Sequence, residues 1–155
     1  MALWTPADIA TELWLDAADA STLTLVSSAV SEWRDKSGNG YHVSQSSSTY
    51  RPECVLAAQN GLDVVRFDGE NDRLVRSTAS DLGRNAAQVH VFVVRKHSVP
   101  PTATRSCFGQ YVPGDSAYFA LFGNDSTGKN RINFRRSATA ANIIITSSGE
   151  AGASF

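Results

Sequence analysis

Three acidic residues stand at alternate positions in a short polar stretch, at Asp68, Glu70 and Asp72. Two carboxylates at such spacing on one strand face are the arrangement with which a glycosidase hydrolyses a sugar chain, and oxygen ligands in series also suit calcium. However, Gly69 and Asn71 lie between them, and both residue types favour turns over strands. The stretch therefore predicts a turn in which an acidic side chain accepts backbone hydrogen bonds, and it does not predict a catalytic pair.

A second polar stretch, Asp-Lys-Ser-Gly-Asn-Gly at residues 35–40, is similar to the first half of an EF-hand calcium loop. Its second half does not fit, because the twelfth position holds Ser46 in place of a glutamate and no helical pattern flanks the loop. A turn closed by its own side chains is the preferred interpretation, and a bound calcium ion is the alternative. No cofactor is predicted, and no residue is assigned as a metal ligand.

No nucleophile stands in a recognisable catalytic motif. The histidines, His42, His90 and His97, lie outside motifs such as Gly-x-Ser-x-Gly, and we interpret each as structural. Residues 123–130 match a P-loop except at Asn130, where a magnesium-binding Ser or Thr is expected. A strand pattern follows, whereas a P-loop must open a helix, so a hairpin turn is favoured. The sequence predicts no catalytic or cofactor-binding residue, and hence no enzyme.

Four aromatic residues lie in or near polar segments, at Trp33, Tyr41, Tyr50 and Tyr111. Flat rings exposed on loops can stack on sugar rings, which would make this face a glycan-binding surface. The alternative is that some of these rings are apolar plugs beneath the loops. The sequence leaves both interpretations open.

Composition narrows the range of partners. The 155 residues include 14 basic and 15 acidic side chains, for a formal net charge of -1, so no basic surface for nucleic acid is predicted. No run approaches the roughly 20 apolar residues of a membrane span, and the N-terminus lacks the pattern of a signal peptide. Cys54 and Cys107 form no metal-binding pair, and two free thiols or one disulfide are the alternatives.

Short apolar segments separated by turn residues dominate the chain, and no long helical period occurs. The N-terminus predicts one short helix at about residues 6–11, and residues 78–87 predict one helical turn. Residues 60–75 predict a central β-hairpin whose turn is the acidic stretch, and residues 88–96 predict a central strand covered on both faces. The pattern predicts an all-β fold, an antiparallel β-sandwich of the jelly-roll type, as one domain over residues 1–155.

Further short strands are predicted from local alternation and β-branched content. They lie at residues 13–15, 30–33, 107–108, 118–122, 131–135 and 142–146. The apolar positions of the strands define a candidate core, formed by Trp14, Phe67, Val91, Val93, Phe119, Leu121, Ile132 and Phe134.

Three pieces of the chain occur in a fixed order. They are Leu-Trp-Leu-Asp-Ala at residues 13–17, Val-Ser-Glu-Trp-Arg-Asp-Lys-Ser-Gly-Asn-Gly at residues 30–40, and Gly-Leu-Asp-Val-Val-Arg-Phe-Asp-Gly at residues 61–69. Together they resemble the start of the laminin-G-like, concanavalin A-like jelly rolls found in many structural proteins of tailed phages. The resemblance covers about residues 4–96. It implies two antiparallel sheets packed face to face and a virion role, as a tail, fibre or head-decoration module.

The resemblance also sets expectations for location and partners. A virion protein made in the host cytoplasm and released by lysis needs no signal peptide, and its partners would be other virion proteins. The fold hosts lectins, hydrolases and passive spacers alike, so a host-surface glycan is expected only from the aromatic residues. The competing hypotheses are a bacterial secreted or surface carbohydrate-binding module and an architectural spacer with no ligand.

Members of that family are longer, and the return strands that close the sandwich are expected but missing after residue 149. The expected consequence is an unpaired sheet edge, which favours a homo-oligomer or contact with a neighbouring part of an assembly. The strand at residues 142–146, with three consecutive isoleucines, is the predicted edge.

Overall fold

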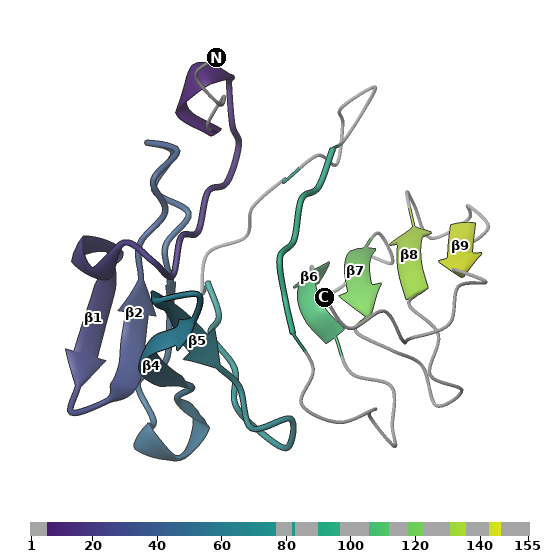
Figure 1. The fold of residues 1–155 in the computed structure, drawn as a ribbon. Helices are drawn as coiled ribbons and strands as arrows, with labels where there is room; N and C mark the ends of the chain where they lie inside the picture. The colour runs from purple at the N-terminus through teal and green to yellow at the C-terminus, as the bar shows by residue number, and fades with distance from the viewer. Residues whose placement is uncertain are drawn as a thin grey trace. The chain divides into compact units, whose positions relative to one another are not determined.

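The computed structural model describes residues 6–76, 82, 90–96, 106–111, 118–122, 131–135 and 143–146. Contacts within the chain group it into two compact units, Met1–Ser80 and Asp81–Phe155, and each unit contains one antiparallel sheet (Figure 1). Helix in the described residues is limited to 3₁₀ turns of three residues. The all-β, antiparallel fold class predicted from the sequence is confirmed. The single jelly-roll domain stays a prediction.

The sheet of the first unit has the strand order β1-β2-β4-β5, and β3 pairs with β2. All of these pairs are antiparallel. The strands are β1 (Leu23–Val26), β2 (Ala29–Trp33), β3 (Val43–Ser44), β4 (Glu53–Gln59) and β5 (Leu62–Arg66). The 3₁₀ turns are η1 (Pro6–Asp8), η2 (Ala20–Thr22) and η3 (Ser48–Tyr50), so the helix expected at about residues 6–11 is reduced to a single short turn.

The hairpin in this sheet differs from the predicted one. We expected residues 60–75 to pair with themselves around the acidic stretch, but β5 pairs with β4, and Asn60 and Gly61 form the connecting turn. Both residues have a positive φ, 53° and 78°, which a tight two-residue hairpin turn requires and which Asn and Gly tolerate best. Val75 forms only an isolated bridge, with Ser44. The predicted partner was wrong because the Asn-Gly pair, and not the acidic stretch, reverses the chain.

The strand predicted at residues 13–15 is also absent. The backbone of Trp14 bonds to a loop and not to a strand: its N–H donates to the Asp35 carboxylate at 2.9 Å, and its carbonyl accepts from Lys36 N–H at 2.8 Å. The Asp35 side chain thus accepts the hydrogen bond that a neighbouring strand would otherwise accept from this backbone. No local sequence pattern predicts such a contact.

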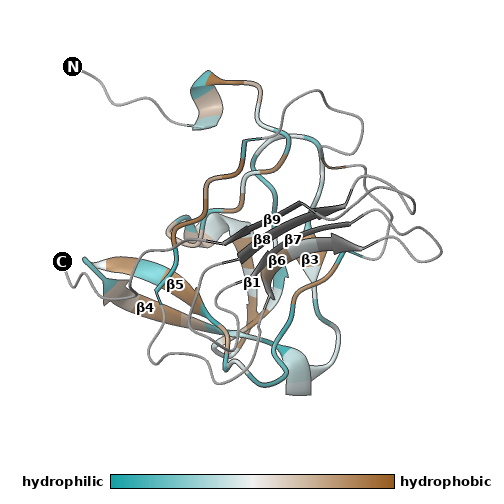
Figure 2. Cartoon of the chain, turned by 90° about the vertical axis from the view of Figure 1, so that its right-hand side faces the viewer, coloured by the Kyte–Doolittle hydropathy of each residue, from teal (hydrophilic) through white to brown (hydrophobic). Residues whose placement is uncertain are grey.

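The core of the first unit is small. Val30 in β2 is completely buried, Cys54 in the paired strand β4 is buried, and Pro52, whose carbonyl accepts from Val30 N–H, is fully enclosed. Apolar residues continue along β4 and β5 (Figure 2). Phe67, which we predicted to be in the core, is 44% exposed, because β5 ends at Arg66 and the alternation of strand faces ends with it.

The sheet of the second unit is a meander with the order β6-β7-β8-β9. Its strands are β6 (Ser106–Tyr111), β7 (Tyr118–Phe122), β8 (Arg131–Arg135) and β9 (Ile143–Thr146), which confirms the strands predicted in this region. Phe119 lies opposite Phe134, and Leu121 lies opposite Ile132, so these four predicted core residues occupy facing positions. The burial of their side chains lies outside what the structure describes.

The central strand predicted at residues 88–96 does not form over its described part. Residues 90–96 belong to no named strand, and the predicted core residues Val91 and Val93 are 39% and 46% exposed. Unbroken apolar character indicates a preference for burial, but it does not supply the neighbouring backbone that a strand needs. Of the helical turn predicted at residues 78–87, only Leu82 is described, and it lies in a turn. In the described residues, no helix has the length and apolar character to cross a membrane.

Candidate functional site

One carboxylate organises the loop that follows β2. Asp35 is buried, with 7% of its surface exposed, and its two oxygens accept four hydrogen bonds. The donors are the N–H groups of Trp14, Ser37 and Tyr41, at 2.9, 2.9 and 3.0 Å, and the Ser37 hydroxyl at 2.7 Å. Desolvation raises the pKa of Asp35, but the hydrogen bonds from Ser37, Trp14 and Tyr41 outweigh it, so the pKa lies below its usual value. The charged carboxylate therefore acts as a structural centre.

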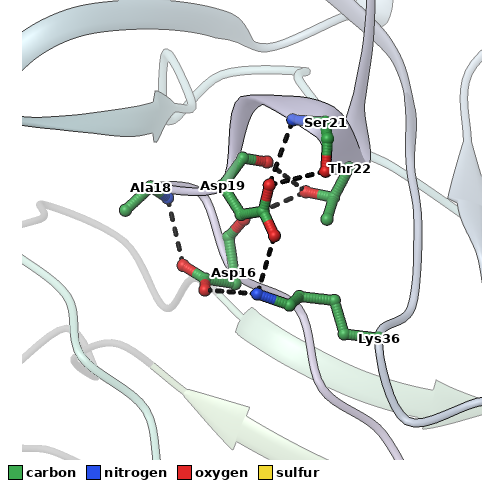
Figure 3. A network of polar contacts seen from close by, with 6 residues as sticks. All are labelled: Asp16, Ala18, Asp19, Ser21, Thr22 and Lys36. Carbon is green, nitrogen blue, oxygen red and sulfur yellow. Dashed lines mark hydrogen bonds and ion pairs between the residues drawn. The ribbon is translucent and has the colours of Figure 1, made fainter.

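The next residue, Lys36, forms two ion pairs (Figure 3). Its Nζ lies 2.7 Å from Asp19 Oδ2 and 3.0 Å from Asp16 Oδ2, and 4.2 Å from the centre of the Trp14 ring. The hydrogen bond from Lys36, followed by that from Ser21, lowers the pKa of Asp19 from 3.8 to about 2. The bond with Asp19 in turn raises the pKa of Lys36. Both groups are thus held in their charged forms.

The acidic partners of Lys36 are themselves fixed by the chain (Figure 3). Asp19 Oδ1 accepts from the N–H of Ser21 at 3.1 Å and from its hydroxyl at 2.6 Å, and Asp16 Oδ1 accepts from Ala18 N–H at 3.1 Å. The buried Thr22 donates its hydroxyl to the carbonyls of Asp16 and Asp19, at 3.0 and 2.8 Å. These bonds fold residues 16–22 into the turn that leads into β1.

Further contacts join residues 11–22 to residues 34–42. We call these two segments together the clamp. Asn39 Nδ2 donates to the carbonyl of Glu12 at 2.9 Å and to that of Thr11 at 3.3 Å. The backbone N–H of Asp35 donates to His42 Nδ1 at 3.0 Å, so this ring nitrogen is an acceptor. His42 thus helps to hold the loop that follows β2.

The acidic stretch after β5 also closes on itself. Asp68 Oδ1 accepts from the N–H groups of Glu70, Asn71 and Asp72, at 2.8, 3.0 and 3.1 Å. Asp72 Oδ2 accepts in return from Asp68 N–H at 2.9 Å. The predicted turn with an acidic side chain as acceptor is confirmed, because the carboxylates of Asp68 and Asp72 accept hydrogen bonds from the backbone of the turn.

In both acidic loops, carboxylate oxygens accept hydrogen bonds from the loop itself. The oxygens of Asp35, and Oδ1 of Asp68, face several N–H or O–H donors, and the positive ends of these dipoles occupy the directions that a cation would take. Within the described ranges, no group of three or more His, Cys, Asp or Glu side chains is placed to hold a metal ion.

Two of the four aromatic candidates for sugar stacking are already paired with arginine. The guanidinium carbon of Arg73 lies 3.8 Å from the centre of the Tyr50 ring, and that of Arg76 lies 4.2 Å from the Tyr41 ring. A hydrogen bond with Glu12 raises the pKa of Tyr41. Each tyrosine therefore has one ring face covered by the protein, as the plug interpretation requires.

Of the other two aromatic candidates, the structure describes the side chain of Trp33. Trp33 is half-buried in β2, and the side chain of Tyr111 lies outside what the structure describes. Within the described part of the chain, the buried donors Trp33 Nε1 and Arg76 Nη1 have no hydrogen-bond partner.

The remaining sequence candidates are dispersed. Cys54 is a buried free thiol, and burial raises its pKa, whereas Cys107 is exposed. His90 is exposed, and His97 lies outside the described residues. The P-loop-like residues 123–130 are also outside them, but they connect β7 to β8, which pair in antiparallel fashion. The element that follows these residues is the strand β8, whereas a P-loop opens a helix.

Sequence reasoning missed one further polar centre, at Gln45. This buried residue donates from Nε2 to the carbonyl of Arg73 at 3.2 Å and accepts at Oε1 from Ser47 N–H at 3.1 Å. Arg51 Nε donates to the Gln45 carbonyl at 2.8 Å. A glutamine in a Ser-rich segment carries no signal of burial, so only the three-dimensional structure could identify it.

No protein-family model and no curated protein matches this chain. A solved structure with a similar fold is that of residues 221–444 of an S-layer domain-containing protein from Clostridium thermocellum. The two chains share 19% sequence identity with a TM-score of 0.59, and the match covers 92% of this chain and 59% of the other. The chain thus spans less than two thirds of that structure. At this level of identity the likeness shows a shared fold.

Proposed function

We propose that this protein is a non-catalytic structural module of a surface assembly, and that the assembly is the virion of a tailed phage. The module would lie in the tail, a fibre or the head decoration. The observation that carries the proposal is the way the acidic loops are used: Asp35, Asp68 and Asp72 accept hydrogen bonds from the chain itself. Carboxylates that accept hydrogen bonds from their own loop serve to position its backbone, which supports a structural role.

The pieces of sequence that resemble phage jelly rolls support this proposal. The piece at residues 13–17 and the piece at residues 30–40 meet in the clamp, through the Trp14–Asp35 and Lys36–Asp16 contacts. The piece at residues 61–69 contains β5 and the start of the Asp68 turn. Each piece therefore shapes the fold, which is what a motif shared by architectural proteins would do.

Contact with other virion proteins, or with further copies of this chain, is proposed at β9. This strand is the last in the order of its sheet and pairs with β8. Its sequence, Ile-Ile-Ile-Thr, contains no charged residue, although charges are the usual device that keeps sheet edges apart. A homo-oligomer built through this edge is consistent with an assembly protein.

Contact with a host glycan is a secondary part of the proposal. Arg73 and Arg76 occupy one face of Tyr50 and Tyr41, so a sugar ring would have to stack on the opposite face of each ring. The spacer hypothesis predicts no binding. A glycan array probed with the purified protein separates the two, with Tyr41→Ala and Tyr50→Ala as the variants that should lose any signal.

A second candidate function, a module of a bacterial cell surface, is favoured by the structural neighbour. That neighbour is an S-layer domain-containing protein, which associates the shared fold with the outside of a cell. Both candidates place a non-catalytic β module in an external assembly, and they differ in the particle that carries it. Immunogold labelling of virions and of cell envelopes distinguishes them.

The absence of catalysis is tested with a panel of polysaccharides. We expect no hydrolysis by the purified protein. Hydrolysis that disappears in Asp68→Asn or Asp72→Asn, but persists in the exposed Glu70→Gln, would overturn the proposal. Thermal melting of each variant separates loss of a catalytic group from loss of the turn that Asp68 holds.

A further inference from the structure

Three dipeptides in the first unit have a sequence prone to cyclisation of the backbone. They are Asn39-Gly40, Asn60-Gly61 and Asp68-Gly69. In each, the side-chain carbonyl carbon can be attacked by the backbone nitrogen of the following glycine, because glycine has no Cβ to hinder the approach. The reaction requires the side chain and the backbone around it to rotate, so the local structure decides which site reacts.

Two of the three side chains are held in place. Asn39 donates from Nδ2 to the carbonyls of Glu12 and Thr11, at 2.9 and 3.3 Å. Asp68 accepts three backbone hydrogen bonds at one carboxylate oxygen, at 2.8, 3.0 and 3.1 Å. Cyclisation at either site would first have to break these bonds.

The third side chain is held far less firmly. Asn60 is exposed at the turn of the β4–β5 hairpin, and its amide accepts one long hydrogen bond, 3.5 Å from Nε2 of the adjacent Gln59. Both residues are themselves exposed, so water competes directly for this contact.

The hairpin tip is also separated from the regular part of the sheet. The ladder runs through the Val55–Val64 pair, and its register then shifts before the Gln59–Leu62 pair. Within this shift Ala57 has a φ of 50°, a strained conformation for a residue with a Cβ, and its N–H donates to Asp63 Oδ1 at 2.9 Å. A short, exposed tip beyond a strained bulge opens more easily than the ladder behind it.

We propose that Asn60 is a site of spontaneous deamidation in the folded protein, with water as the co-reactant. The Gly61 nitrogen loses its proton to solvent base and bonds to Cγ of Asn60, and the side-chain nitrogen leaves as ammonia. Water then opens the cyclic imide at one of its two carbonyls, giving aspartate or isoaspartate. Either product adds a negative charge to the tip, and isoaspartate also adds a methylene to the backbone, which a tight two-residue turn does not accommodate.

Peptide mapping by mass spectrometry after incubation at mildly alkaline pH tests the proposal. The rate at each Asn-Gly site in the folded protein is divided by its rate in denaturant, which removes the effect of the neighbouring residue types. We expect this ratio to be several-fold higher for Asn60 than for Asn39. Equal ratios, a higher ratio for Asn39, or an unchanged Asn60 over the time in which the denatured chain converts would each overturn the proposal.

Two variants test the contribution of the hairpin. Asp63→Ala removes the acceptor that fixes the Ala57 N–H and should accelerate conversion of Asn60 while leaving Asn39 unchanged. Conversion of Asn60 that is no faster in this variant would contradict the role given to the bulge. Asn60→Gln should abolish the modified hairpin peptide, and its persistence would assign the signal to another residue.

Discussion

Trp14 and Asp35 are 21 positions apart in the sequence and are joined by a hydrogen bond of 2.9 Å from a backbone N–H to a buried carboxylate. This bond ties the segment before β1 to the loop after β2, and the ion pairs of Lys36 reinforce it. The side chains of Asp35 and Lys36 therefore hold the segment before β1 in place, as the backbone hydrogen bonds of an additional strand would. The contribution of the clamp to stability can be measured directly.

Replacing the central carboxylate should weaken the fold. Asp35→Asn keeps the size of the side chain but turns an NH₂ group toward N–H donors, and we expect a loss of roughly 2–4 kcal/mol in the free energy of unfolding. Urea denaturation measures this value. Glu70→Gln, an exposed change of the same type, should stay within about 0.5 kcal/mol of the wild type. Equal effects of the two substitutions would contradict the role of Asp35.

The clamp should also make the protein sensitive to acid. The pKa of Asp19 falls from 3.8 to about 2, through Lys36 and Ser21, and that of Asp35 is also lowered on folding. A carboxylate whose pKa is lower in the folded state stabilises the protein above its unfolded pKa, and this contribution is lost as the pH falls through the folded value. Stability should therefore decrease between about pH 4 and pH 2, and Asp19→Asn should make this decrease shallower. An identical pH profile for the variant would refute the assignment.

Glycine at position 57 should relieve the backbone strain at the bulge in β4. Ala57 has a φ of 50°, which costs an L-residue roughly 1–2 kcal/mol. Ala57→Gly removes this strain but adds freedom to the unfolded chain, so we expect a net gain of up to about 1 kcal/mol. Ala58→Gly, in the same strand without the positive φ, should instead lose about 0.5–1 kcal/mol. Chemical denaturation of both variants provides the comparison, and a loss in both would contradict the strain at Ala57.

We expect truncation of Val30 to lower the free energy of unfolding more than truncation of Phe67, although Phe67 is the larger residue. Val30 is completely buried, whereas Phe67 is 44% exposed. We expect Val30→Ala to cost roughly 2–3 kcal/mol and Phe67→Ala less than about 2 kcal/mol. Thermal or urea unfolding of the two variants tests this order, and the reverse order would place Phe67 in the core after all.

Association is expected to depend on β9. If copies pair through this edge, light scattering should show oligomers of the wild-type protein, and Ile144→Lys should shift them toward the monomer. Leu62→Lys, which changes an exposed apolar residue of the other sheet, should leave the oligomers intact. A wild-type protein that stays monomeric at high concentration would contradict the proposed edge contact.

Local signals predicted the strands of the second sheet and part of the first. The alternation of residues 131–135 and the β-branched run at residues 143–146 correspond to β8 and β9, and the acidic stretch closes on Asp68 as its composition indicated. The sequence predicts the turn of the hairpin at the acidic stretch, whereas Asn60 and Gly61 form it. The conformation of these segments depends on residues a few positions away in the chain, so it can be predicted from the local sequence.

The contacts that the sequence does not predict join residues that are far apart in the chain. The Trp14–Asp35 bond, the ion pairs of Lys36 and the burial of Gln45 join segments separated by many residues, and no local pattern encodes them. The apolar run around Val91 predicts a buried strand, but Val91 is 39% exposed. Apolar character alone does not identify which part of the chain would cover such a strand.

The most direct test of the proposed function is the location of the protein, by immunogold electron microscopy of virions and cells from one lysed culture. The proposal predicts gold on the tail, the fibres or the capsid of the particles. Gold confined to the cell envelope, with particles from the same culture unlabelled, would contradict the virion assignment and favour the cell-surface module instead.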